Sequence, residues 1–334
     1  MIKAIALLSG GLDSTLAIKV VLEQGIEVEA LNFITLFCRC TTKGSTCLAS
    51  QKAAKRLGIG LRVVNISEEF LEVVKRPKHG YGKNVNPCLD CRVLMFRKGR
   101  EYMKQNGASF IVTGEVLGER PMSQRRDAMQ IIERESGLQG LILRPLSAKL
   151  LPLTVPERKG WVSRERMLAI AGRSRKPQIK LASDYGIKDY PCPAGGCLLT
   201  DPGFALRMKD LMKNRPDFSL NDVHLLKLGR HFRLTSLAKV VVGRNEGEND
   251  KILSLAKEGD TILRVKNFPG PLALARGEVS RQEILQSAII TAKYSKAKLL
   301  PEVEVEYQVI HMPPKEILVP PSMTEDDLKL LRIN

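Results

Sequence analysis

The feature that most constrains the fold is the segment Ser9-Gly10-Gly11-Leu12-Asp13-Ser14, close to the N-terminus. The preceding residues 5–8 are apolar, which predicts a buried parallel strand, and residues 15–22 have helical spacing. Two glycines between a strand and a helix let backbone N–H groups approach an anion, and the helix dipole favours negative charge there. The segment is therefore expected to be a phosphate cradle rather than only a tight turn with a polar N-cap.

The residues of this loop do not match the Lys-bearing P-loop, because no Gly-Lys-Ser/Thr follows the glycines. It resembles instead the PP-loop of ATP pyrophosphatases, whose pattern is Ser-Gly-Gly-x-Asp-Ser. The resemblance implies cleavage of ATP between the α and β phosphates to adenylate a substrate, with Mg²⁺ assisting and Asp13 as a catalytic, metal-linked or phosphate-orienting residue. The residues expected to bind ATP lie in the loop and at two strand ends: Ser9, Gly10, Gly11, Asp13, Ser14, Thr15, Asn32, Phe33, Thr113 and Gly114.

Strand and helix patterns alternate through the first part of the chain. Strands are expected at 28–34, 61–66 and 110–114, with helices at 49–57 and 93–106. Such alternation predicts a Rossmann-like α/β domain of the adenine nucleotide alpha hydrolase-like type, with a parallel sheet and right-handed crossovers. Ligands of such sheets bind at the carboxyl ends of the strands. The phosphate loop, a cysteine loop and Thr113-Gly114 all follow strands at that edge.

The pattern changes after residue 145 and again near residue 220. Residues 146–220 are rich in proline, glycine and basic residues, whereas strands are expected at 238–242, 260–265 and 303–307 and a helix at 280–294. We therefore expect a PP-loop domain at 1–145, a basic connecting region at 146–220, and a separate α+β domain at 221–334.

The net charge of +17 is concentrated in the first two-thirds of the chain. Residues 1–216 hold 36 of the 53 Lys and Arg and 20 of the 36 Asp and Glu, so the remainder is nearly neutral. The densest basic stretch runs from Arg158 to Lys180 and contains one acidic residue, Glu165. A bias of this kind favours a polyanionic partner, although a merely solvated surface is the alternative. No apolar run approaches the ~20 residues that span a bilayer, and no signal-peptide layout is seen, so a cytoplasmic location is expected.

Seven cysteines, at positions 38, 40, 47, 88, 91, 192 and 197, point to metal binding or sulfur chemistry. An odd number of clustered cysteines argues against a disulfide framework. The Cys-x-x-Cys of Cys88 and Cys91 could be a redox pair, half of a zinc site or part of a cluster. Cys38, Cys40 and Cys47 could bind a second metal, relay sulfur or be reduced thiols, and their role stays open.

The segment around Cys88 and Cys91, with Val112-Thr113-Gly114 after it, resembles the tRNA 2-thiouridine synthetases of the MnmA/TrmU family. Gly196-Cys197-Leu198-Leu199 is similar to the second catalytic cysteine segment of that family, whereas Thr113 to Gly118 looks like the 4-thiouridine synthetases of the ThiI family. In the wider thiolase group, Cys-x-x-Cys plus one cysteine accompanies a [4Fe-4S] cluster. The resemblance thus implies Cys88, Cys91 and Cys197 as metal ligands, with zinc as the alternative metal. Without a cluster, Cys91 and Cys197 become the catalytic and persulfide-bearing thiols.

The C-terminal part, at about residues 235–312, resembles the NFACT-R RNA-binding domain. The resemblance rests on Gly243-Arg244-Asn245 with Asn249-Asp250, on Pro269-Gly270, and on Ala292 to Lys296. Since bulk charge is nearly neutral here, RNA contact would depend on local cations. Across both regions the residues expected to bind RNA are Arg158, Lys159, Arg173, Arg175, Lys176 and Arg244, with Lys266, Arg276 and Lys296 as further phosphate contacts.

These features together predict an ATP-dependent tRNA thiouridine synthetase that adenylates a uridine carbonyl and then transfers sulfur. Its partners would be tRNA and a sulfur donor, either sulfide or a persulfide carrier. Two alternatives stay open: a tRNA- and nucleotide-binding zinc protein without catalysis, and a PP-loop adenylating enzyme that acts on a small molecule. The sequence indicates neither the uridine position, nor C2 against C4, nor the oligomeric state.

Overall fold

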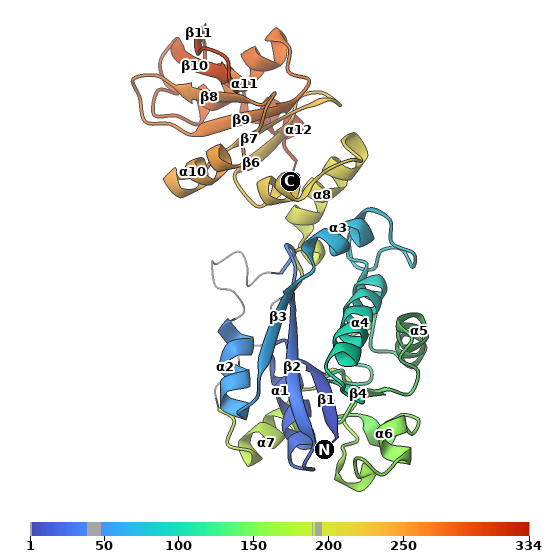
Figure 1. Cartoon of the computed structure of the whole chain (residues 1–334). Coiled ribbons are helices and arrows are strands. Elements are labelled where there is room, and N and C mark those ends of the chain that lie inside the picture. The colour runs from blue at the N-terminus through green and yellow to red at the C-terminus, as the bar shows by residue number, and fades with distance from the viewer. Residues whose placement is uncertain (1, 39–47, 189, 191–195, 334) are drawn as a thin grey trace. The chain divides into compact units, whose positions relative to one another are not determined.

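The computed structural model describes residues 2–38, 48–188, 190 and 196–333 of the chain (Figure 1). It divides into two units, Met1–Leu198 and Leu199–Asn334, each of which is treated by itself. The first unit contains the expected domain 1–145 and most of the basic segment after it. The finer division at residues 145 and 220 stays a prediction.

A five-stranded parallel sheet forms the centre of the first unit. Its strand order is β3-β2-β1-β4-β5, and every neighbouring pair is parallel. The strands are β1 (Lys3–Leu7), β2 (Glu27–Ile34), β3 (Leu61–Asn65), β4 (Phe110–Thr113) and β5 (Ile142–Leu143). The predicted Rossmann-like α/β fold is thereby confirmed.

Helices cover both faces of this sheet, because alternate residues of a strand point to opposite sides. Ala4 and Ala6 of β1 belong to a core cluster with α1, whereas Ile5 and Leu7 belong to another with α4, whose Phe96 is fully buried. Figure 1 shows α4 and α5 side by side. The helices are α1 (Leu12–Leu22), α2 (Leu48–Leu57), α3 (Ser67–Lys75), α4 (Cys88–Gln105), α5 (Arg126–Ser136), α6 (Val155–Arg158) and α7 (Lys176–Asp184), with short 3-10 turns η2 (Ala148–Leu150) and η3 (Arg164–Arg166).

The order of the sheet places a topological switch point between β1 and β4. The chain proceeds from β1 outward to β2 and β3, and then returns to the other side of β1 to form β4 and β5. In the aligned register Leu7 of β1 lies beside Leu31 of β2 and Thr113 of β4. The residues that follow these three strands therefore meet at one edge, where such sheets open a ligand crevice.

The second unit is built on a six-stranded antiparallel sheet of order β11-β10-β8-β9-β7-β6. The strands are β6 (Arg230–Arg233), β7 (Ala238–Val242), β8 (Thr261–Val265), β9 (Leu272–Gly277), β10 (Val303–Val309) and β11 (Lys315–Val319). Helix α11 packs on this sheet and buries Ala288, Ile290 and Ala292 in its core. The other helices are α8 (Pro202–Asn214), which follows the turn η4 (Leu198–Thr200), α9 (Leu220–Leu226), α10 (Glu246–Ser254), α11 (Arg281–Lys293) and α12 (Glu325–Leu331). The expected C-terminal α+β domain is confirmed.

None of the helices in the described parts of the chain has both the length and the apolar character that crossing a membrane requires.

Candidate functional site

The phosphate loop joins the end of β1 to the start of α1. Gly10 has φ +79°, and a Cβ on it would lie 2.5 Å from backbone atoms of Ala49 and Ser50, so only glycine fits without a shift. Ser9 Oγ accepts a bond from the Gly11 N–H at 3.3 Å and lies 3.1 Å from Ser14 Oγ. Helix α1 begins after Gly11 with no side-chain cap on its first N–H groups. The uncapped helix start beside a glycine turn is the arrangement that an anion cradle needs.

Gly114, at the end of β4, lies directly against this loop. A Cβ on Gly114 would be 2.4 Å from Ser14 N and 2.5 Å from Asp13 C, which is well inside ordinary contact. Thr113 before it is 4% exposed. The close approach joins the two strand ends on either side of the switch point, so the predicted ATP residues of the loop and of β4 form one surface.

Asn32 and Phe33 lie near the end of β2, the neighbour of β1 on the side away from β4. The buried Asn32 side chain donates to the Leu8 carbonyl at 2.7 Å and so ties the two strand ends together. Phe33 is half-buried and packs against the core cluster that contains Leu31. Their predicted contact with adenosine is through the backbone, and it stays a prediction.

Asp13 forms an ion pair with a residue far away in the sequence. Arg175 Nη2 lies 2.9 Å from Asp13 Oδ2 and 3.4 Å from Glu119 Oε1. Burial raises the pKa of the Glu119 carboxyl, and the nearby Asp13 charge raises it further. The buried Oδ1 of Asp13 has no hydrogen-bond partner among the described residues. The carboxylates of Asp13 and Glu119 therefore lie together at the phosphate loop. Among the described residues, Asp13 Oδ1 has no donor and could bind a cation.

Four cysteines of the described chain gather near the carboxyl edge of the sheet. Cys88 and Cys91 lie in the first turn of α4. The backbone of Cys197 forms an antiparallel bridge with Cys38, supported by a bond from Leu198 N to the Phe37 carbonyl at 2.9 Å. Cys197, Cys88 and Cys38 lie close enough to Cys91 that a negative charge on any of their sulfurs would raise the pKa of Cys91. Sequence positions 38, 88–91 and 197 therefore form one group, the thiol cluster.

The thiols of α4 are buried, and their charged forms are correspondingly disfavoured. Burial raises the pKa of both Cys88 and Cys91, while the Arg92 guanidinium opposes the rise. Asn86 Nδ2 lies 2.9 Å from Cys88 Sγ. In the described part of the chain, no three His, Cys, Asp or Glu side chains are already arranged to hold a metal ion. Cys40, Cys47 and Cys192 lie outside the described residues.

The predicted RNA-binding residues of the first unit differ in their exposure. Arg158, Lys159, Arg173 and Lys176 are exposed, and Lys159 Nζ lies 4.9 Å from the centre of the Trp161 ring. Arg175 is half-buried on Asp13, so its guanidinium faces the phosphate loop.

In the second unit Arg244 forms an ion pair with Glu248 at 2.6 Å and keeps about half of its side chain exposed. Arg276 is 7% exposed and binds Asp222 at 2.9 Å and Asp260 at 2.7 Å. The prediction that Arg276 contacts phosphate was wrong, because its charge is already used inside the domain. Arg276 lies in β9, whose residues from Leu272 to Ala275 are also buried, and the local sequence did not reveal its two acidic partners.

The structure adds to what the sequence indicated for three residues. Cys38, whose role the sequence left open, joins the thiol cluster, and its place after β2, next to the strand that carries the phosphate loop, was the available signal. Glu115 was noted only as part of the Thr113 to Gly118 segment, with no role of its own, and Glu119 was not singled out. Glu115 is 1% exposed and accepts from Arg144 Nε at 3.0 Å, and it lies 3.5 Å from Arg92 Nε.

The parallel sheet, the glycine turn at a helix start and the nearby thiols define a PP-loop type of α/β domain, followed by an α+β domain. Residues 2–149 match the family described as Thiamine biosynthesis protein (ThiI), and residues 229–330 match the family described as NFACT protein RNA binding domain. The chain therefore joins a ThiI-type PP-loop domain to an NFACT-type RNA-binding domain.

Individual relatives agree with the first of these matches. The tRNA-specific 2-thiouridylase MnmA of Sulfurimonas denitrificans is 35% identical over 114 residues, which are 33% of this chain and 33% of that protein. The enzyme of the same name from Marinobacter nauticus is 24% identical over 300 residues, covering 82% of this chain and 71% of its own length. The chain thus spans about a third of the first relative and more of the second.

Solved structures with partial similarity include two RNA-modifying enzymes. A 4-thiouridine synthetase–RNA complex with bound ATP has 19% identity and a TM-score of 0.35, covering 55% of this chain and 51% of its own. The U34-tRNA thiolase NcsA from Methanococcus maripaludis, with its [4Fe-4S] cluster, has 18% identity and a TM-score of 0.34, covering 67% and 70%.

Proposed function

We propose that this protein is an ATP-dependent tRNA thiouridine synthetase. The observation that carries the proposal is the meeting of a phosphate loop and a thiol cluster at the carboxyl edge of one parallel sheet. The phosphate loop would activate a carbonyl oxygen by binding ATP, and the thiol cluster would supply sulfur. Both steps are needed to replace a carbonyl oxygen by sulfur. The match to the ThiI family, the MnmA relatives and the RNA-binding domain at 229–330 support tRNA as the substrate.

The proposed reaction has two steps. The carbonyl oxygen of a uridine attacks the α-phosphorus of ATP, a new P–O bond forms, and the bond to the β-phosphate breaks to release pyrophosphate. Hydrosulfide, or its equivalent from a sulfur donor, then attacks the activated carbon. The C–O bond breaks, AMP leaves with the former carbonyl oxygen, and the proton of the hydrosulfide is lost. The base must leave its stack to reach this edge.

The chain's own residues would serve the first step by holding charge. The N–H groups at the start of α1, from Gly11 to Ser14, would bind the pyrophosphate, and the backbone at Asn32-Phe33 and Thr113-Gly114 would frame adenosine. Mg²⁺ prefers carboxylate oxygens, and the unpartnered Asp13 Oδ1 beside Glu119 fits such an ion. A bound Mg²⁺ would offset the charge that develops on the leaving pyrophosphate.

For the second step we propose Cys88, Cys91 and Cys197 as ligands of a [4Fe-4S] cluster, with zinc as the alternative. Thiolates are the ligands that both metals take from proteins, so the donor chemistry of the thiol cluster fits. Held by these three cysteines, such a cluster would supply an iron that can take up sulfur. Because the thiols are not yet arranged as a complete set, the three side chains would rotate on binding.

The tRNA would bind through exposed cations of the first unit and through the second unit. Arg158, Lys159, Arg173 and Lys176 are available for phosphate contacts, and Arg244 is half-exposed in the RNA-binding domain. Affinity should then fall steeply with salt. We place the reaction in the cytoplasm, where tRNA is modified.

The test is the reaction itself with anaerobically purified protein. Bulk tRNA, ATP, Mg²⁺ and sulfide should give AMP, pyrophosphate and a thiolated uridine, which nucleoside mass spectrometry assigns to C2 or C4. Cys88→Ala and Cys197→Ala should each abolish thiolation, whereas Cys192→Ala should have a milder effect. Release of no AMP with any tRNA would refute the enzyme, and AMP formed without RNA would indicate a small-molecule substrate. Zinc without iron in active protein would refute the cluster.

A further inference from the structure

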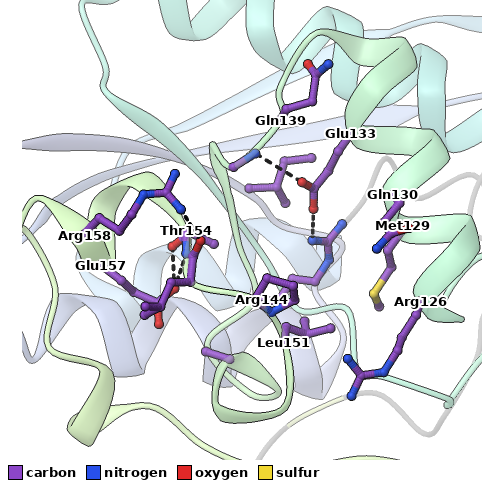
Figure 2. Close-up of a pocket in the computed structure, with 15 residues that line it drawn as sticks. Arg126, Met129, Gln130, Glu133, Gln139, Arg144, Leu151, Thr154, Glu157 and Arg158 are labelled. Atoms are coloured by element: carbon purple, nitrogen blue, oxygen red, sulfur yellow. Dashed lines mark hydrogen bonds and ion pairs between the residues drawn. The ribbon is translucent and has the colours of Figure 1, made fainter.

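A cavity of about 340 Å³ lies beside β5, the edge strand of the parallel sheet (Figure 2). Its walls come from α5, from residues 139–144 and from residues 148–158. No lining residue belongs to the phosphate loop or to the thiol cluster. The volume is at the lower end of the ~300–1,000 Å³ that small-ligand sites occupy. It has room for one small group and not for a helix or a strand.

The inner wall combines apolar side chains with a buried charge. Met129, Ile142 and Ala148 are almost fully buried. Arg144 is 4% exposed. Its Nε donates to Glu115 at 3.0 Å, and its Nη1 donates to Glu133, a pair that Figure 2 shows. Its remaining nitrogen, Nη2, is buried and has no partner among the described residues. A buried donor without an acceptor is costly, so this wall is incomplete without a ligand that accepts a hydrogen bond.

The rim carries positive charge that the described residues do not neutralise. Arg126 and Arg158 are exposed, and each donates to a backbone carbonyl at 2.7 Å. The carboxylates of the wall are already engaged, since Glu133 pairs with the inner arginine and Glu157 lies 2.7 Å from Arg164. Two guanidinium groups therefore face solvent at the mouth with no acidic partner in the described residues. Guanidinium forks bind phosphate oxygens well.

We propose that this cavity binds one unpaired nucleotide of the RNA substrate. The phosphates on its 5′ and 3′ sides would bind Arg126 and Arg158, which lie on opposite sides of the cavity in Figure 2. Its ribose and base would cover the apolar wall, and a base carbonyl would accept from Arg144 Nη2. RNA-binding proteins commonly recognise single unstacked bases by hydrogen bonds to the base edges. The inference rests on the proposed function for its RNA partner, and it names a contact away from the reacting uridine.

Binding measurements on the full chain test the site. Arg126→Gln and Arg158→Gln should each weaken tRNA binding about threefold and reduce the slope of log K against log salt by about one, the effect of one phosphate contact. Met129→Trp, which fills the cavity, should weaken binding with the slope unchanged. Arg134→Gln is the matched control, because it removes an exposed arginine from the same helix without lining the cavity. ATP affinity should be the same in all four variants.

A photoreactive phenylalanine analogue at position 130, on the cavity wall, should crosslink to one unpaired tRNA nucleotide. If the rim variants bind tRNA as tightly as the wild type, the proposal is overturned. It is also overturned if the variants keep their tRNA affinity but bind free AMP or ATP more weakly, because the cavity would then be a site for a free nucleotide. Wild-type protein that fails to bind tRNA would count against the proposed function itself. Wild-type protein that thiolates tRNA and tolerates the rim changes would refute this inference alone.

Discussion

The contact between Gly114 and the phosphate loop provides the sharpest test of the site. In Gly114→Ala the new Cβ would lie 2.4 Å from Ser14 N and 2.5 Å from Asp13 C. Ordinary van der Waals contacts for such an atom begin near 3.4 Å. Because all the atoms involved are backbone, no flexible side chain can move aside. The end of β4 and the start of α1 must therefore separate by about 1 Å.

Overpacking of this kind costs roughly 1–3 kcal/mol of folding free energy, and a 1 Å displacement of binding groups can cost about 100-fold in function. We expect Gly114→Ala to lower the unfolding free energy of the first unit by about 2 kcal/mol and to weaken ATP binding at least tenfold. Trp161, the one tryptophan of the chain, stacks near Phe110 of β4 at 6.2 Å and reports unfolding of this unit by fluorescence. Titration calorimetry measures the ATP affinity.

Gly60→Ala is the matched control for this change. Its Cβ would meet nothing closer than Glu29 Cγ at 3.9 Å, and its φ is not positive. It should leave both quantities unchanged. If Gly114→Ala is destabilised but binds ATP normally, the contact is structural only and the crevice argument fails. If neither quantity changes, the backbone approach itself is refuted.

Two further predictions concern charges. Arg175→Ala removes the partner of Asp13 and should lower the unfolding free energy of the first unit by about 1–3 kcal/mol. Arg173→Ala removes an exposed arginine and should leave the unfolding free energy unchanged. Urea unfolding followed by Trp161 fluorescence measures both variants. Burial lowers the pKa of Lys239 to about 7, so between pH 7 and 10 the unfolded chain binds more protons and stability should rise with pH, by at most about 1.4 kcal/mol per unit. Lys239→Met should flatten that rise, as measured by hydrogen exchange of β7 amides after correction for intrinsic rates; a slope equal to that of the wild type would refute the assignment.

Local patterns in the sequence were sufficient to predict the fold class of both units, although they did not predict strands β5, β6, β9 and β11. Strand β7 was predicted at 238–242, where the structure has it, and the helix expected at 280–294 is α11. These elements have strong periodicity and clear ends, such as the Ser280 capping box. The helix expected from residue 93 begins earlier, at Cys88. Its first turn was missed because it carries cysteine and polar residues instead of the apolar spacing that marks a helix.

Contacts between distant segments could not be predicted in the same way. Arg175 was placed on an RNA surface because it lies in a basic stretch, yet its guanidinium reaches Asp13, 162 positions earlier. The density of basic residues along a chain predicts a basic region. It does not predict which basic side chain forms an ion pair with a carboxylate in the folded protein. The same reason explains Arg276, which the structure buries between two acids.

Glu115 shows how the fold combines features that the sequence keeps apart. It follows the Thr113-Gly114 end of β4, and its buried carboxylate lies between Arg92, next to Cys91, and Arg144, in the wall of the cavity. A buried carboxylate requires such partners. The two arginines in turn are held in place by it, one beside the thiol cluster and one toward the proposed nucleotide site. The strand that closes against the phosphate loop therefore also fixes the cations on either side of the sheet's edge, so that the groups proposed to activate the substrate, to bear sulfur and to bind RNA all depend on one short segment.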